Sequence, residues 1–207
     1  MPDNPQKTDI SKLLNKTPVV ADPATTGVSP DDPCTQNVIP ATAICGALAV
    51  AEGNTKYTQG QPPSKITTNA ASGKYQIQTE TATDQIMKIR KISNRNEAKA
   101  LWLKCRQSAA PECQKLQDDV CASYSNFQGE YLKSKGFLLT GTNRYLAWNQ
   151  GHGGAEIILK AAAANQPVTN TRVLERMKAQ TSWAYTPDAK QWIKNMQGHI
   201  QPRGYPI

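Results

Sequence analysis

The stretch VIPATAICGALAVAEGN, residues 38–54, is almost wholly apolar until its last three residues. A proline in its first turn and a Gly-Asn pair at its end are typical of helix starts and stops, so the sequence predicts a helix over 38–52. Ile44, Leu48 and Glu52 are spaced at i, i+4 and i+8, which places the carboxyl on the same face as two apolar side chains. We therefore expect Glu52 to lie at the edge of an apolar core.

A carboxyl in that position is chemically useful. Burial disfavours its ionised form, so its pKa rises and it can hold a proton near neutral pH and deliver it to a leaving oxygen. The alternative is that Glu52, in the last turn of the helix, points to solvent. Glu52 is the candidate general acid.

A second cluster, ASGKYQI, spans residues 71–77. Glycine allows a close backbone turn, Tyr75 offers a flat apolar ring and Gln76 offers an amide that both donates and accepts. Sugars bind to such groups, because their rings stack on aromatic side chains and their acetamido and hydroxyl groups pair with amides. Taken alone, the heptapeptide is also consistent with an ordinary turn that leads into a helix.

A third cluster, YLAWNQGHGGA, spans residues 145–155 and ends one predicted helix in a glycine-rich turn that begins another. The backbone amides of a helix start could hold an anion, but no strand precedes the turn and no Lys-Ser/Thr follows it, which argues against a nucleotide P-loop. The other interpretation is a tight corner between helices that presents Trp148 and Asn149 to a cleft.

The order of these clusters resembles the motif series of the lytic transglycosylases in the lysozyme superfamily: Glu after an apolar helix, then Gly-x-x-Gln-Ile, then Ala-aromatic-Asn-x-Gly. Ala51-Glu52-Gly53 with the glycine turn is also similar to the lambda-type phage endolysins. Residues 119–132 resemble the family's helix that leads to Gly-x-x-Tyr-Leu. The resemblance covers roughly residues 38–178. It implies a mainly α, lysozyme-like helical domain.

The resemblance also implies an activity, cleavage of the β-1,4 bond between N-acetylmuramic acid and N-acetylglucosamine in peptidoglycan. Glu52 would be the single catalytic residue, and Tyr75, Gln76, Trp148 and Asn149 would bind the glycan strand. No cofactor and no metal are expected. Two positions depart from the family pattern: Gly53 stands where a serine is common, and Trp148 stands where relatives carry a tyrosine that contacts the catalytic carboxyl.

Two other functions stay open. A hydrolytic muramidase would use water where a transglycosylase uses the 6-hydroxyl of the muramic acid, and a wall-binding or structural protein on the same scaffold would cleave weakly or not at all. A second carboxylate is not required, because substrate assistance is a known exception to the two-carboxylate scheme. Glu80 and Asp84 are interpreted as surface or helix-terminal charges.

The composition limits the partners. Among 207 residues, 38% are hydrophobic and the formal net charge is +8, which favours an anionic partner such as cell wall. Lys and Arg are scattered rather than clustered with aromatics, so nucleic acid is not the expected partner. Without an apolar run of about 20 residues, no membrane span is expected. The start of the chain lacks the pattern of a secretory signal peptide.

The five cysteines contain no CxxC pair, so a zinc site is not expected. Cys34 with Cys45, and Cys105 with Cys113, flank predicted turns and could form disulfides in an oxidising compartment. Buried free thiols are the alternative.

Residues 1–36 are rich in Pro, Asp, Thr and Asn and predict an extended, Pro-rich arm that serves as a linker or contacts another subunit. Residues 37–182 are expected to form the lysozyme-like domain, with 183–207 as a helix and tail packed on it. The arm, the missing signal and the third cluster look most like phage virion or tail-associated transglycosylases, so the expected location is a phage particle acting at the host periplasm and cell wall, with other virion or tail proteins as partners. Export by a secretion or conjugation apparatus is the alternative. Further helices are predicted at 79–92, 95–107, 111–135, 142–150, 153–164, 170–181 and 187–197.

Overall fold

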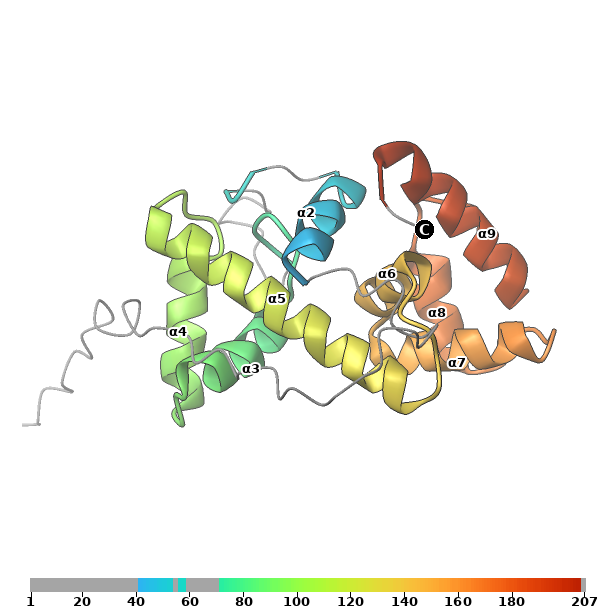
Figure 1. Cartoon of the computed structure of the whole chain (residues 1–207), viewed down its shortest axis with the longest axis horizontal. Helices are drawn as coiled ribbons and strands as arrows, with labels where there is room; N and C mark the ends of the chain where they lie inside the picture. Colours follow the sequence, from blue (N-terminus) through green and yellow to red (C-terminus); the bar gives the residue numbers. More distant parts are fainter. Residues whose placement is uncertain (1–40, 54–55, 59–70, 206–207) are drawn as a thin grey trace, which may run out of the picture. The chain divides into compact units, whose positions relative to one another are not determined.

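The computed structural model describes residues 41–53, 56–58 and 71–205, and these residues are mainly helical (Figure 1). The mainly α class is therefore confirmed, and the only extended backbone pairing in these ranges is two isolated bridges, Ser72 with Ile77 and Pro167 with Asp188. The predicted arm and the expected start of the first helix at 38–40 lie outside the described residues. The helices are α2 (Ala41–Ala51), α3 (Thr79–Arg90), α4 (Arg95–Cys105), α5 (Pro111–Ser134), α6 (Gly141–Gln150), α7 (His152–Ala163), α8 (Thr171–Ala179), α9 (Ala189–Ile200) and the short 3-10 helix η3 (Gln201–Arg203).

Each predicted helix is present, with ends that differ from the prediction by up to three residues. Side-chain caps explain several starts: Asn94, Thr140, Asn170 and Asp188 each accept a hydrogen bond from a backbone N–H in the first turn of the following helix. No helix within the described ranges is both long and apolar enough to cross a membrane.

The helices belong to two compact units. The described residues of 54–124 form the first unit, with α3, α4 and the first part of α5. Those of 26–53 and 125–207 form the second unit, with α2, the rest of α5 and the elements from α6 to η3. The expected domain limits at residues 36 and 182 stay predictions.

In the first unit α3 lies against α4, and the interior side chains include Ile86, Leu101 and Trp102, each no more than 1% exposed. A disulfide joins Cys105, the last residue of α4, to Cys113 in the first turn of α5. One of the two disulfides suggested by the sequence is thus confirmed. The other involves Cys34, which lies outside the described residues.

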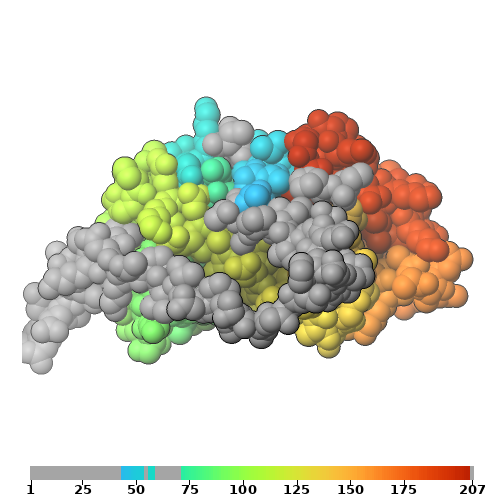
Figure 2. Space-filling view, in the orientation of Figure 1, coloured from blue at the N-terminus to red at the C-terminus, as the bar shows by residue number. Residues whose placement is uncertain are grey.

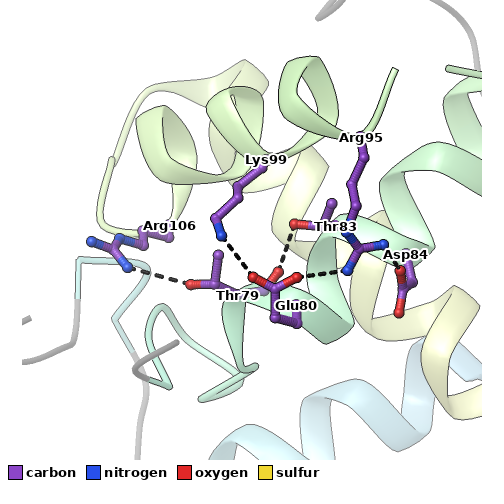
Figure 3. A network of polar contacts seen from close by, with 7 residues as sticks. All are labelled: Thr79, Glu80, Thr83, Asp84, Arg95, Lys99 and Arg106. Atoms are coloured by element: carbon purple, nitrogen blue, oxygen red, sulfur yellow. Dashed lines mark hydrogen bonds and ion pairs between the residues drawn. The ribbon is translucent and has the colours of Figure 1, made fainter. Parts of the chain in front are cut away.

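An exposed ion network also links α3 to α4 (Figure 3). Glu80 accepts hydrogen bonds from Arg95 at 2.6 Å and from Lys99 at 2.7 Å, and Asp84 pairs with Arg95. These contacts lower the pKa of Glu80, and the hydrogen bond from Lys99 is a larger cause than the one from Arg95. The interpretation of Glu80 and Asp84 as surface charges is confirmed, and solvent screening keeps their contribution to stability small.

The second unit is centred on α6, α7 and α9. Trp192, Met196 and Ile200 recur at i, i+4 and i+8 on α9 and are fully buried. The remaining positions of α9 are mostly polar and at least partly exposed, and the helix lies at the molecular surface, in red in Figure 2. This pattern explains why an amphipathic sequence forms a helix here. It also places the residues that follow α9 beside α6, since the Tyr205 ring lies 5.3 Å from the ring of Tyr145.

Candidate functional site

Glu52 lies in the turn that closes α2. Its backbone N–H donates to the carbonyl of Leu48 at 2.9 Å, and Gly53 then takes a φ of +72°, a conformation that favours glycine. Ile44 and Leu48 are buried, at 0% and 1% exposure, and Glu52 is half-buried. The expected position of Glu52 is therefore confirmed: it lies at the edge of the apolar interior instead of pointing freely into solvent.

A tyrosine from another helix contacts the carboxyl. Tyr145, on α6 and 2% exposed, donates its hydroxyl to Oε1 of Glu52 at 3.2 Å. Burial, followed by the negative charge of Glu52, raises the pKa of Tyr145, so its hydroxyl stays protonated and remains a donor. Sequence reasoning did not single out Tyr145, although it lies three residues before Trp148 and therefore on a neighbouring position of the same helix face.

A cation lies close to the same carboxyl. Arg203, on η3, donates from one guanidinium nitrogen to the carbonyl of Ala51 at 2.7 Å, directly beside Glu52. Burial is the largest influence on Glu52 and raises its pKa, while the hydrogen bond from Tyr145 and the charge of Arg203 lower it. The net effect is a carboxyl whose pKa is above its ordinary value and which still has groups that stabilise its anion.

The second predicted cluster lies in the first unit. Ser72 and Ile77 pair through their backbones and close a turn in which Gly73 has a φ of +76° and Gln76 a φ of +50°. Tyr75 is buried, at 3% exposure, and its hydroxyl donates to Asp118 at 2.5 Å. The turn expected from the sequence is thus present.

Gln76 is half-buried, and its amide nitrogen donates to the carbonyl of Gly73 at 2.9 Å. This contact keeps the side chain over its own turn. Because Tyr75 and Gln76 belong to the first unit and Glu52 to the second, their expected convergence on one glycan stays a prediction.

The third cluster forms a corner between helices, as one of its two interpretations expected. α6 ends at Gln150, Gly151 takes a φ of +74°, and α7 begins at His152. Trp148 and Asn149 lie in the last turn of α6, half-buried, and the Asn149 side-chain oxygen accepts a hydrogen bond from Gln150 at 2.7 Å. Their role in substrate binding stays a prediction.

Two hydrogen bonds from neighbouring helices fix this corner. Gln128 on α5 donates to the carbonyl of Ala147 at 2.6 Å, and Arg176 on α8 donates to the carbonyl of Gln150 at 2.9 Å. Both acceptors belong to the end of α6, where helix carbonyls lack partners within the helix. The last turn of α6 is therefore held from two neighbouring helices.

Glu156, another acidic residue of the second unit, is ion-paired and therefore differs from Glu52. Glu156 on α7 pairs with Lys160 at 2.6 Å and with the hydroxyl of Tyr131, and these two contacts lower its pKa, with Lys160 the larger cause. A carboxyl of that kind is a poor proton donor near neutral pH. Within the described residues, no three His, Cys, Asp or Glu side chains gather as a metal site would need.

Comparisons with protein-family models, with curated proteins and with solved structures find no significant match for this chain. The functional assignment therefore depends on the residues and their geometry.

Proposed function

We propose that this protein is a peptidoglycan lytic transglycosylase in which Glu52 is both the general acid and the general base. The observation that carries the proposal is the Glu52 carboxyl itself, which is half-buried at the end of an apolar helix, has a raised pKa and accepts a hydrogen bond from Tyr145. The motif order in the sequence supports the same assignment, and a lysozyme-like fold is proposed with it.

In the first step, protonated Glu52 gives its proton to the glycosidic oxygen as the bond from that oxygen to C1 of the muramic acid breaks, with the substrate acetamido group assisting. In the second step the 6-hydroxyl oxygen attacks C1, and its proton passes to the ionised Glu52. The product is a 1,6-anhydro sugar, and Glu52 is again protonated. No second carboxylate and no cofactor enter the scheme.

The surroundings of Glu52 suit a residue that works in both states. Burial favours the neutral acid that the first step needs. Tyr145 and Arg203 stabilise the carboxylate that remains after proton transfer, because a hydrogen-bond donor and a cation both favour the anion. These influences oppose each other, and the pKa of Glu52 stays above its ordinary value, which suits a residue that must first give a proton and then take one back.

The mass of the products released from purified peptidoglycan tests this proposal. A transglycosylase releases 1,6-anhydro muropeptides, a hydrolytic muramidase releases products heavier by one water with a reducing end, and a wall-binding protein releases none. Either of the last two results contradicts the transglycosylase assignment. The net charge of +8 is compatible with an anionic wall polymer as substrate.

The place where the enzyme acts is also a proposal. We place the enzyme in a phage particle, where it would open the host cell wall locally, with residues 1–36 joining it to other virion or tail proteins. Deleting that arm is a direct way to separate delivery from cleavage, because the candidate site residues all lie after it.

Tyr145→Phe is expected to lower kcat/KM by about 10-fold, since a hydrogen bond to a charged group is worth about 1.5–3 kcal/mol and part of it is recovered by solvent. Loss of the donor raises the pKa of Glu52, so the activity should fall at a higher pH on the alkaline side of the profile. The measurement is kcat/KM against pH on a soluble glycan fragment. Tyr205→Phe is the matched control, because the buried Tyr205 hydroxyl has no hydrogen-bond partner in the described structure. Equal effects of the two changes would contradict a specific role for the Tyr145 hydroxyl.

A further inference from the structure

The helix that carries Glu52 is held at its end by a residue about 150 positions later in the sequence. Arg203 donates to the carbonyl of Ala51, one of the last carbonyls of α2, at 2.7 Å. Such carbonyls have no partner within the helix and carry partial negative charge, so a guanidinium is a favourable cap. The same guanidinium lies against Gly53, where an added Cβ would be 3.8 Å from it.

The tyrosine that contacts Glu52 is held from the same segment. Tyr205, two residues after Arg203 and 2% exposed, places its ring edge-on at 5.3 Å from the Tyr145 ring. The ring of Trp183 packs against the same tyrosine in a tilted arrangement, with 6.4 Å between the ring centres. Aromatic pairs in these arrangements are favourable and directional, so the Tyr145 ring has little freedom to turn its hydroxyl away from Glu52.

The turn between the two residues has its own constraint. Gly204 takes a φ of +76° and donates its N–H to the carbonyl of Gln201 at 2.9 Å, while Tyr205 donates back to Ile200 at 3.3 Å. The chain therefore reverses directly after η3. This reversal is what allows Arg203 to reach α2 while Tyr205 is buried against α6.

We propose that the segment Gln201–Tyr205 positions Glu52 for proton transfer, with Arg203 fixing the end of α2 and Tyr205 fixing the ring of Tyr145. Both are positioning residues, since each acts through another group. The inference deepens the function proposed above and depends on the role given there to Glu52.

The segment Gln201–Tyr205 also acts on the charge of Glu52, through the guanidinium of Arg203. The groups that face Glu52 are Tyr145 from α6 and Arg203 from η3. His199 from α9 lies near Arg203. Its pKa is lowered, first by burial and then by the positive charge of Arg203. Arg203 is exposed, so salt screens its effect on Glu52 in part. The cation should therefore stabilise ionised Glu52 more strongly at low ionic strength.

The test compares Arg203→Met with Arg203→Lys, which keeps the charge but not the planar fork of donors. The first readout is the titration of the Glu52 carboxyl by carbon NMR, with its signal identified by its loss in Glu52→Gln. We expect the pKa of Glu52 to rise in Arg203→Met and to stay closer to the unmodified protein in Arg203→Lys. This readout needs no substrate, so it separates the positioning role from the proposed activity.

The second readout is the kinetics. Misplacement of a catalytic group by about 1 Å costs up to about 100-fold in rate, so Arg203→Met should lower kcat by about 10- to 100-fold with little change in KM, and Arg203→Lys should recover part of the loss. Tyr205→Leu should lower kcat in the same way, whereas Tyr205→Phe should not, because it keeps the ring that contacts Tyr145.

An unchanged Glu52 titration in Arg203→Met would overturn the proposal, even if the variant lost activity, because a merely structural change would then explain the loss. If the titration shifts as expected but the unmodified protein releases no product from peptidoglycan, the interaction of Arg203 with Glu52 stands and the proposed function fails. Thermal unfolding of each variant shows that the titrated protein is folded.

Discussion

Glu52→Gln is expected to reduce the release of soluble products from purified peptidoglycan by about 10,000-fold, at the upper end of what general acid-base catalysis contributes. The amide keeps the shape of the side chain and can still accept the hydrogen bond from Tyr145, but it can neither give nor take the proton. Because one residue serves both steps, neither step has a substitute. Product release is measured by chromatography with mass detection against the unmodified protein.

Glu175→Gln is the matched control, since Glu175 is an exposed carboxyl on α8 and its replacement makes the same change from carboxyl to amide away from Glu52. This control should cleave normally. If Glu52→Gln retains more than a few per cent of the activity, another carboxyl is the acid and the single-glutamate mechanism is wrong.

The same variant should be at least as stable as the unmodified protein at neutral pH. Burial raises the pKa of Glu52 in the folded protein, so its ionisation costs free energy of folding as the pH rises through that pKa. The neutral amide avoids the cost. The difference in melting temperature between Glu52→Gln and the unmodified protein should therefore shrink as the pH falls below the raised pKa, and a variant that melts lower at neutral pH would show that the amide disturbs the fold.

The helices and the place of Glu52 could be predicted from the sequence because both depend on local patterns. Spacing of apolar residues and cap residues act within a few positions, and they located α2 and the burial of Ile44 and Leu48 correctly. The predicted helix ends differ from those of the structure where contacts with other parts of the protein decide where the helix stops. α9, for example, continues to Ile200 because that residue is buried in the second unit.

The partners of Glu52 could not be predicted in the same way. The family resemblance places Trp148 where relatives have a tyrosine at the catalytic carboxyl, whereas the hydroxyl that contacts Glu52 here comes from Tyr145, one turn earlier on α6. A check of the residues three and four positions before Trp148 would have found it. Arg203 had no local signal at all, because its contact with Ala51 spans 152 positions and depends on the tertiary fold.

Gly73→Ala is expected to lower the free energy of unfolding by about 3 kcal/mol, the sum of a left-handed backbone for alanine and an overpacked interior. Gly73 has a φ of +76°, and an added Cβ would lie 2.4 Å from the side-chain oxygen of Gln117 and 2.8 Å from the backbone oxygen of Arg106. The backbone atom cannot move without shifting the end of α4.

Gln117 cannot yield easily either, because it is fully buried and uses both ends of its amide. Its oxygen accepts from the backbone of Lys74 at 3.0 Å, and its nitrogen donates to the carbonyls of Cys105 at 2.8 Å and Tyr57 at 3.2 Å. Moving it leaves buried polar groups unpaired, which is costly. The turn that carries Tyr75 and Gln76 should therefore lose its geometry in Gly73→Ala.

Gly136→Ala separates the two causes of the loss. Gly136 has a φ of +79°, nearly that of Gly73, but an added Cβ there would have no atom within 4 Å. In this variant the free energy of unfolding should fall by only about 1 kcal/mol, the contribution of the backbone, whereas in Gly73→Ala it should fall by about three times as much. Chemical unfolding followed by circular dichroism measures both values. Equal losses would mean that the contact with Gln117 relaxes at no cost, and that the close approach at Gly73 does not fix the turn.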